Sequence, residues 1–437
     1  MAVSALDNRY ATEMNAVFDE EKKLAKWLEV EVALAKAHAK LGHIPKKAAE
    51  GIARAAGKVR LERVRQIEAE IHHDLMAMVR ALEEACGGEA GAFVHLGATS
   101  YDIEDTATAL VFRDAFALIK KRLRELHGIV VRLAKEKRDL VCVGRTHGQH
   151  AVPTTYGLKF AVWARELERH LERLEEAGKR LYVGKMSGAV GSMATFGKDA
   201  FKLQQAVMRE LGLHAAEATN QVIQRDRHAE ALFILALIAA TMEKIAKEIR
   251  NLQRSEIAEV AEPFGRRQVG SSTMPQKRNP HRSERICGLA RVVRANVLAA
   301  LENIPLEHER DLTNSASERL VFSESFIITD YMLKEATAIL GGLEFFPENI
   351  KRNLEGSKGL ILAERVMIAL AEKGMPRGRA HALLREASIK AKSEGRHLKE
   401  VLAENAEVTR LLTARELEEL FDYSTYVGKA KEIVDAL

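Results

Sequence analysis

Residues 112–133 read FRDAFALIKKRLRELHGIVVRL, and the apolar residues of this stretch recur at alternating steps of four and three. That spacing places them on one face of a long helix, as in a seam packed against neighbouring helices. A similar spacing recurs at 160–174 and 245–252, whereas the alternation typical of strands is hard to find. The seam residues of the first stretch are Phe112, Phe116, Ile119, Leu123, Leu126, Val130 and Leu133. The sequence therefore predicts an all-α helix bundle.

Proline placement indicates long helices. No proline occurs between Pro153 and Pro263, which allows helices of about thirty residues or more, each roughly 45 Å long. Residues 231–240, ALFILALIAA, are the longest apolar run; they are too few to span a bilayer and predict a helix buried on all sides. Prolines and glycines gather in segments that we interpret as bundle turns. These segments are 144–157, 184–197, 263–280 and 341–347.

Composition is that of a large globular protein. The 437 residues are 47% hydrophobic, so the chain can bury a sizeable core in about two to four domains. A net charge of only +5, dispersed along the chain, argues against nucleic acid as a partner but suits a small anionic substrate.

The three cysteines are far apart and indicate a reducing compartment. The N-terminus lacks the pattern of a signal peptide, so we expect a cytoplasmic protein.

The segment 270–280, GSSTMPQKRNP, gathers hydroxyls, a cation and an amide in one loop. Removing a proton from the carbon beside a carboxylate makes a dianion, which Lys277 and Asn279 would stabilise. A nearby cation and oriented backbone N–H groups can stabilise the alkoxide of a serine in such a loop, so Ser271 or Ser272 is a candidate base. The alternative is that Ser271 to Thr273 only form a turn at the entry to a helix.

Two other segments invite different interpretations. His147 and His150 are three residues apart, but no further ligand lies nearby at metal-binding spacing, so we expect no metal. The stretch 184–191, GKMSGAVG, lacks the GxGxxG spacing and follows no recognisable strand, so we interpret it as a bundle turn and not as a dinucleotide loop.

The loop at 270–280 resembles the signature of the aspartase/fumarase superfamily, lyases that eliminate a C–N or C–O bond and release fumarate. RTHGQ at 145–149 resembles a second superfamily motif, which implies that His147 is the general acid. Histidine suits the protonation of a leaving amine near neutral pH. VHLGATSYD at 94–102 resembles the first signature region, whose Thr-Ser pair binds a substrate carboxylate.

The superfamily resemblance implies a three-domain all-α fold. Its central long-helix bundle would form the core of a homotetramer, and three chains would contribute to each active site. The expected domains are an N-terminal helical domain at 1–105, the bundle at 106–357 and a C-terminal helical domain at 358–437. Long helices with apolar seams also need more packing partners than one thin bundle provides.

Further stretches resemble the adenylosuccinate lyase family and cover nearly the whole chain. They are NRY at 8–10, HHD at 72–74, QVIQRDRH at 221–228, HERD at 308–311 and SASER at 315–319. One departure is Asn220, where threonine is common. Arginines suit a phosphate because guanidinium groups bind it in bidentate fashion.

This resemblance implies cleavage of adenylosuccinate to AMP and fumarate, and of the succinyl-carboxamide ribotide SAICAR to AICAR and fumarate. It implies no cofactor. Ser271 would take the Cβ proton and His147 would protonate the departing nitrogen. His73 would orient or polarise the acid, and Glu284 matches a glutamate paired with a catalytic histidine. The implied substrate-binding residues are Arg9, Tyr10, His72, Asp74, His95, Thr99, Ser100, Thr146, Gln221, Ser272, Asn279, Arg310, Ser315 and Arg319.

Alternatives remain at this stage. The superfamily motifs alone fit argininosuccinate lyase or another fumarate-releasing lyase equally well, and members of the superfamily also serve as noncatalytic structural proteins. Only the family pattern separates Ser271 from Ser272 as the base. His72 and His73 could also be partly exposed helix residues without a role in catalysis.

Overall fold

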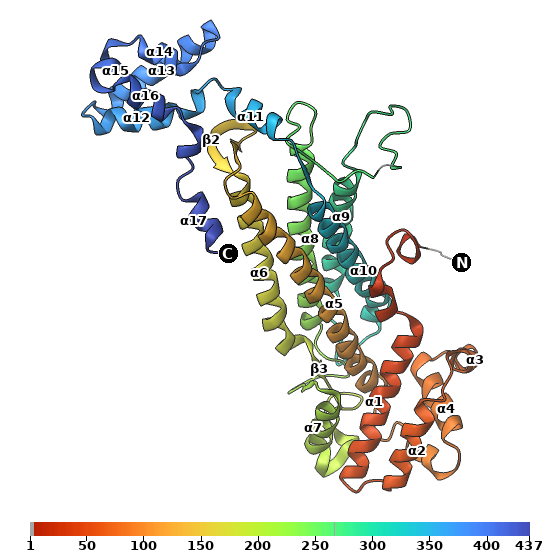
Figure 1. Cartoon of the computed structure of the whole chain (residues 1–437). Coiled ribbons are helices and arrows are strands. Elements are labelled where there is room, and N and C mark those ends of the chain that lie inside the picture. Colours follow the sequence, from red (N-terminus) through yellow and green to blue (C-terminus); the bar gives the residue numbers. More distant parts are fainter. Residues whose placement is uncertain (1–3, 266) are drawn as a thin grey trace. The chain divides into compact units, whose positions relative to one another are not determined.

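The computed structural model describes residues 4–265 and 267–437, and most of them are helical (Figure 1), which confirms the all-α prediction. The α-helices are α1 (Glu20–Lys40), α2 (Lys46–Ala56), α3 (Leu61–Ile71), α4 (Asp74–Cys86), α5 (Ser100–Glu136), α6 (Tyr156–Leu181), α7 (Ala200–Leu211), α8 (Asp226–Leu252), α9 (His281–Glu302), α10 (Thr313–Gly341), α11 (Pro347–Glu355), α12 (Ala363–Glu372), α13 (Arg377–Glu394), α14 (Leu398–Ala403), α15 (Ala406–Leu411), α16 (Ala414–Leu420) and α17 (Ala430–Asp435). The strands are β1 (Val141–Thr146), β2 (Gln149–Thr155), β3 (Val183–Gly184), β4 (His214–Ala215), β5 (Val260–Ala261) and β6 (Glu344–Phe345). Short 3₁₀ helices occupy Ala5–Asp7, Glu13–Val17, Gly88–Phe93, Ala194–Asp199, Leu360–Leu362 and Tyr423–Thr425.

The longest helix, α5, carries the seam predicted at 112–133. It has 37 residues, or about 55 Å at the α-helical rise. All seven seam residues are buried, from fully covered Phe116 to Leu133 at 5% exposure. The steps of four and three therefore mark the packed face of α5, as predicted.

The chain divides into two compact units, and α5, α6, α8, α9 and α10 contribute residues to both. The first unit comprises 1–124, 169–243 and 286–335. In it α1 packs against α2 and α7 (Figure 1), and Phe112 and Phe116 of α5 contact Phe326 of α10 at ring-centroid distances of 5.3 and 4.8 Å.

The second unit comprises 125–168, 244–285 and 336–437. Its C-terminal helices α12 to α16 lie together (Figure 1). They enclose a hydrophobic core that includes Leu362, Leu370 and Leu398. The division into three domains that we expect from the sequence stays a prediction. None of the helices in the described ranges is both long and apolar enough to cross a membrane.

Three details differ from the predictions. The segment 144–157 is not a simple turn, because β1 and β2 form an antiparallel hairpin before α6 begins at Tyr156. The segment 184–191 does follow a strand, since β3 pairs in parallel with β4, although β3 has only two residues. The run at 231–240 is not buried on all sides: Phe233 is 54% exposed and Ala240 is exposed as well.

Candidate active site

The N-terminal end of α5 presents two hydroxyl groups. Thr99 immediately precedes the helix and Ser100 is its first residue. The carboxylate of Asp102 accepts a hydrogen bond from the backbone N–H of Thr99 at 2.9 Å, which caps the helix start. The positive end of the helix dipole and free N–H groups favour an anion at this place. A substrate carboxylate therefore fits the predicted roles of Thr99 and Ser100.

Asp102 does not repel such an anion, because its charge is neutralised. Lys185 donates to it at 2.5 Å, and both side chains are fully buried. The carboxylate also accepts from the backbone N–H groups of Ser187 at 2.8 Å and of Gly188 at 3.1 Å. Lys185 lies in the glycine-rich segment that the sequence suggested was only a turn. The spacing of charged residues in the sequence did not predict its pairing with Asp102.

Gln221 and Arg310, both predicted to contact substrate, lie together. Arg310 donates to the side-chain oxygen of Gln221 at 2.9 Å, and its guanidinium carbon lies 3.7 Å from the ring centroid of Tyr101. Gln221 also donates to the backbone oxygen of Ala189 at 3.1 Å. The loops that carry the QVIQRDRH and HERD motifs are thus fixed to each other. This arrangement presents a guanidinium group stacked on an aromatic ring.

Ser315 and Arg319 of α10 line a cavity of about 370 Å³ together with Lys23, Trp27 and Glu104. Its cations and hydroxyl group suit a phosphate, and Trp27 supplies an apolar surface. Burial, reinforced by the nearby charge of Asp74, raises the pKa of Glu104 to about 7. The carboxyl group of Glu104 therefore takes up a proton readily near neutral pH, so it opposes an incoming anion less than an ordinary glutamate would.

Asp74 holds Arg319 in place. The guanidinium of Arg319 donates to the Asp74 carboxylate at 2.6 Å. Burial alone would raise the pKa of Asp74, but the hydrogen bonds from Arg319 and from the backbone of Leu75 outweigh burial and lower it. Asp74 and Arg319 were both predicted from the sequence, but their pairing across the chain was not.

His72 and His73 form the link between α3 and α4 and do not lie inside a helix. His72 caps the end of α3 and His73 caps the start of α4, where its Nδ1 accepts from the backbone N–H of Met76 at 3.4 Å. Both side chains are exposed. The cap places His73 next to the Asp74 that binds Arg319.

One ring nitrogen of His95 is occupied, because its Nδ1 lies 2.6 Å from Glu31 of α1; the predicted substrate contact of His95 stays a prediction. Burial alone would lower the pKa of His95, but the hydrogen bond and charge of Glu31 outweigh burial and raise it. Glu31 was missed by the sequence analysis, although a carboxylate amid the apolar residues of α1 could have signalled a buried partner. Further toward the N-terminus, Arg9 is exposed and the Tyr10 ring lies 5.1 Å from that of Tyr331.

The signature loop encloses the oxygen of Ser271. Ser271 Oγ accepts hydrogen bonds from the backbone N–H groups of Thr273 at 3.3 Å and Met274 at 3.2 Å. These bonds form the turn that the sequence analysis gave as the alternative to a catalytic role. They also provide the donors that would stabilise an alkoxide. Ser272 and Lys277 are exposed.

The two arms of the signature loop are closed on each other. Asn279 donates its side-chain amide to the backbone oxygen of Gly270 at 3.0 Å. A Cβ at position 270 would lie 2.1 Å from the backbone oxygen of Lys277, so only glycine allows this approach. Asn279 therefore fixes the loop, and its second amide N–H remains available for substrate.

His147 is at the tip of the β1–β2 hairpin. Thr146 pairs with Gln149, which leaves His147 and Gly148 as a two-residue loop in which both have positive φ, 55° and 74°. This is the geometry of a type I′ turn. Thr146 and His147 are exposed at this tip. Within the described ranges, no hydrogen bond or ion pair joins His147 to the signature loop or to Glu284, which is exposed in the first turn of α9.

Backbone strain marks several of the predicted motifs. Positive φ is uncommon for residues other than glycine, and four histidines adopt it. They are His72, His95, His147 and His308. Each falls in a motif that the sequence analysis singled out. Met193, Ala258 and Lys358, which lie outside these motifs, also have positive φ, so this backbone conformation does not by itself distinguish the motifs.

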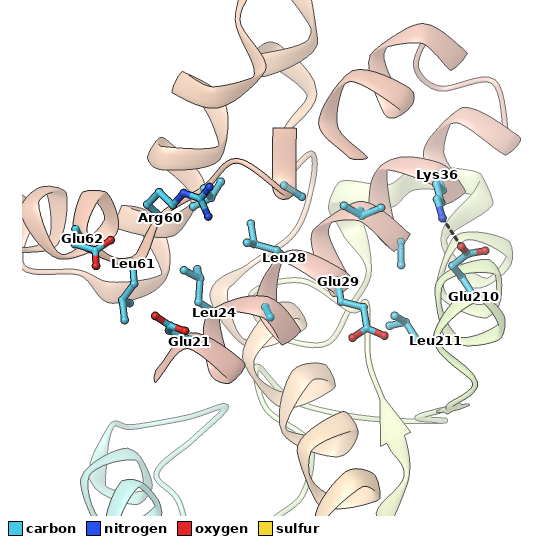
Figure 2. A pocket seen from close by; sticks show the side chains of 15 residues that line it. Glu21, Leu24, Leu28, Glu29, Lys36, Arg60, Leu61, Glu62, Glu210 and Leu211 are labelled. Carbon is cyan, nitrogen blue, oxygen red and sulfur yellow. Dashed lines mark hydrogen bonds and ion pairs between the residues drawn. The ribbon is translucent and has the colours of Figure 1, made fainter. Parts of the chain in front are cut away.

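The groove in Figure 2 is lined by residues of α1, of the segment 56–62 and of the end of α7. It has a volume of about 610 Å³ and an apolar floor that includes Leu24, Leu28 and Leu211. Figure 2 shows the ion pair of Lys36 with Glu210 at its side, at 2.6 Å. None of the candidate catalytic or binding residues lines it, so we assign it no part in the chemistry. No group of three potential metal ligands was found in the described part of the chain.

Two protein-family models and the sequence of a known enzyme match this chain. A model described as Lyase matches residues 7–295, and one described as the adenylosuccinate lyase C-terminus matches residues 359–437. The chain is 58% identical to an adenylosuccinate lyase of Pyrococcus abyssi, over 100% of this chain and 97% of the relative.

Two solved structures are similar over nearly the full length. A fumarate lyase from Mesorhizobium sp. BNC1 has a TM-score of 0.90 at 36% identity, covering 98% of this chain and 97% of that one. A 3-carboxy-cis,cis-muconate lactonizing enzyme from Pseudomonas putida has a TM-score of 0.91 at 35% identity, covering 99% and 98%. This fold thus carries more than one chemistry.

Proposed function

We propose that this chain, which belongs to the adenylosuccinate lyase family of the aspartase/fumarase superfamily, cleaves adenylosuccinate to AMP and fumarate. By the same elimination it would cleave SAICAR to AICAR and fumarate. The observation that carries the proposal is the 58% identity to the Pyrococcus abyssi adenylosuccinate lyase over the whole chain. The solved neighbours do not decide the substrate, because they share the fold at 35 and 36% identity under other names.

In the proposed reaction, Ser271 removes a proton from Cβ of the succinyl group. The electron pair forms the Cα–Cβ double bond of fumarate and the C–N bond breaks. His147 then protonates the departing nitrogen. Lys277 and Asn279 stabilise the dianion that forms while the proton leaves. The donors on Ser271 Oγ support its role as base, since they favour the charged form of the hydroxyl group.

The substrate binds through anion-binding groups at both of its ends. The substrate carboxylates are held by Thr99, Ser100 and Ser272. The nucleotide phosphate is held by the hydroxyl group of Ser315, by Arg319 and by other cations of the first unit. No cofactor takes part, since the proton transfers and charge stabilisation come from side chains. The substrate is a small anionic nucleotide in the cytoplasm, and neither nucleic acid nor a membrane is a partner.

The enzyme works as a homotetramer with shared sites. Support comes from apolar side chains left uncovered on the long helices. On α8, Phe233 is 54% exposed, and Leu237 and Ala240 follow it on the same helix face with partial or full exposure. Leu298 of α9 and Leu320 of α10 are 63% and 70% exposed. Large apolar side chains left exposed on long helices are typical of subunit interfaces.

A direct assay tests the activity. Purified protein given adenylosuccinate should produce AMP and fumarate, followed by the absorbance change on AMP formation and by chromatography of both products. Argininosuccinate serves as the comparison substrate and should remain uncleaved. Cleavage of argininosuccinate alone would assign the other lyase activity, and inertness toward both substrates and SAICAR would indicate a noncatalytic homologue.

Replacing Arg319 by alanine should chiefly raise the Michaelis constant for adenylosuccinate, by about tenfold or more, because a charge-assisted phosphate contact is lost in ground and transition states alike. Arg63→Ala is a matched control: Arg63 is 47% exposed and bound to Glu84 at 2.7 Å, whereas Arg319 is 53% exposed and bound to Asp74 at 2.6 Å. Steady-state kinetics of both variants give the answer. An unchanged Michaelis constant in Arg319→Ala would rule out a phosphate subsite at this residue.

A further inference from the structure

A second cavity, of about 600 Å³, lies in the second unit between the end of α8 and the arm of the signature loop at 276–280. Its charged lining is dominated by cations, and a single carboxylate accompanies them. The charged lining residues are Lys247, Arg250, Arg254, Lys277, Arg278 and Glu284. Ser271 and Ser272 do not line it, so the cavity meets the loop at residues 276–280 and not at the candidate base.

Most of these cations lack a counterion. Arg278 is bound to Glu344 at 3.1 Å. Across residues 4–265 and 267–437, no ion pair involves Lys247, Arg250, Arg254 or Lys277. Like charges around one cavity repel each other, and the repulsion is relieved when an anion enters. An anion with two or more charges gains most, because it contacts several cations at once.

Hydrogen bonds hold the two walls of the cavity together. The side-chain amide of Gln253 in the segment after α8 donates to the backbone oxygen of Arg278 at 3.0 Å. The side-chain oxygen of Gln253 accepts from the backbone N–H of Glu262 at 2.9 Å. The Glu262 carboxylate in turn accepts from the backbone N–H of Ser283 at 2.6 Å, at the start of α9. The backbone segments that carry the cations are therefore held together before any ligand arrives, which lowers the cost of binding.

We propose that this cavity binds a small polyvalent anion, either a phosphate or a dicarboxylate, and that the bound anion slows turnover by engaging Lys277. The cavity shares Lys277 and Asn279 with the proposed chemistry, so the effect on turnover rests on the proposed function. An anion held by Lys247, Arg250 and Arg254 competes with the reacting dianion for the ammonium group of Lys277. The cavity is thus an inhibitory anion site beside the reaction centre.

The test measures initial rates at saturating adenylosuccinate and constant ionic strength, with inorganic phosphate or fumarate as the probe. Saturating substrate removes simple competition at the substrate's own subsites, and constant ionic strength removes general screening. One or both probes should lower the turnover of the unaltered enzyme. In Lys247→Ala/Arg254→Ala the uninhibited rate should be retained, but about tenfold more anion should be needed for the same inhibition. The control Lys47→Ala/Arg54→Ala removes two exposed cations of α2 and should respond like the unaltered enzyme.

Titration calorimetry of the same probes against these proteins makes the outcome independent of activity. Inhibition or binding by phosphate alone, or by fumarate alone, identifies the source of the anion. Equal sensitivity of the cavity variant and the unaltered enzyme overturns the proposal, as does failure of both probes to bind. If the protein cleaves no adenylosuccinate, the proposed function fails, but calorimetry still shows whether the cavity binds the anions.

Discussion

Replacing Ser271 by alanine should lower turnover by a factor on the order of 10³ or more, which is within the range attributed to a positioned general base. The Michaelis constant for adenylosuccinate should change much less, because Ser271 interacts with the Cβ proton mainly in the transition state and not in the bound substrate. In the structure Ser271 Oγ accepts two backbone N–H groups, at 3.2 and 3.3 Å. These donors favour the alkoxide, and alanine removes the atom that they serve.

Ser272→Ala provides the neighbouring control. Ser272 is exposed, and within the described residues no backbone N–H donates to its hydroxyl group. We therefore expect Ser272→Ala mainly to weaken carboxylate binding, with a smaller loss of turnover than Ser271→Ala. Rapid-quench measurement of a single turnover separates the chemical step from product release in both variants. If Ser271→Ala kept more than about a tenth of the original rate, the base would have to lie elsewhere.

The fold could be predicted where one kind of spacing dominated the sequence. The steps of four and three in α5 identify a buried seam, because helical periodicity reports directly which face is packed. The prediction that 231–240 is buried on all sides was wrong in part, because an apolar helix face that is exposed on a single chain has the same sequence pattern as one buried in the core. Phe233 shows this difference, at 54% exposure. Sequence periodicity alone does not separate packing within a chain from packing between chains.

The β1–β2 hairpin was missed for another reason. Its turn consists of His147 and Gly148, both with positive φ. A hairpin turn of this type usually carries asparagine or aspartate before the glycine. With histidine in that position, the sequence did not indicate a hairpin. The glycines and Pro153 around it favoured a plain turn instead.

Candidate site residues could be identified from motifs, but their partners could not. Asp74 and Arg319 are far apart in the sequence and pair at 2.6 Å. Lys185 neutralises Asp102 from a segment with no charge pattern of its own, and Glu31 binds His95 from α1. Buried charges need partners, yet which residues meet depends on the packing of helices, and a single sequence does not encode that in any local spacing.

Two inactive variants should restore activity when they share a tetramer. If His147 and Ser271 reach each active site from different subunits, a mixed tetramer of His147→Ala and Ser271→Ala contains some sites in which both residues are intact. Random mixing in equal amounts makes each contribution intact in about half of the cases, so about a quarter of the original activity should return. In the described chain no hydrogen bond or ion pair joins His147 to the signature loop, which is the arrangement that sharing requires.

The measurement denatures the two variants together, refolds the mixture and follows adenylosuccinate cleavage. Each variant refolded alone supplies the background, and a mixture of two preparations of Ser271→Ala controls for refolding itself. Differently tagged chains purified in sequence establish that hybrid tetramers have formed. Recovery should rise and fall with the mixing ratio and peak at equal amounts, because that ratio gives the most sites with both residues intact. Hybrid tetramers as inactive as either parent would show instead that one subunit supplies both His147 and Ser271, and the uncovered apolar residues of α8, α9 and α10 would then serve assembly without shared catalysis.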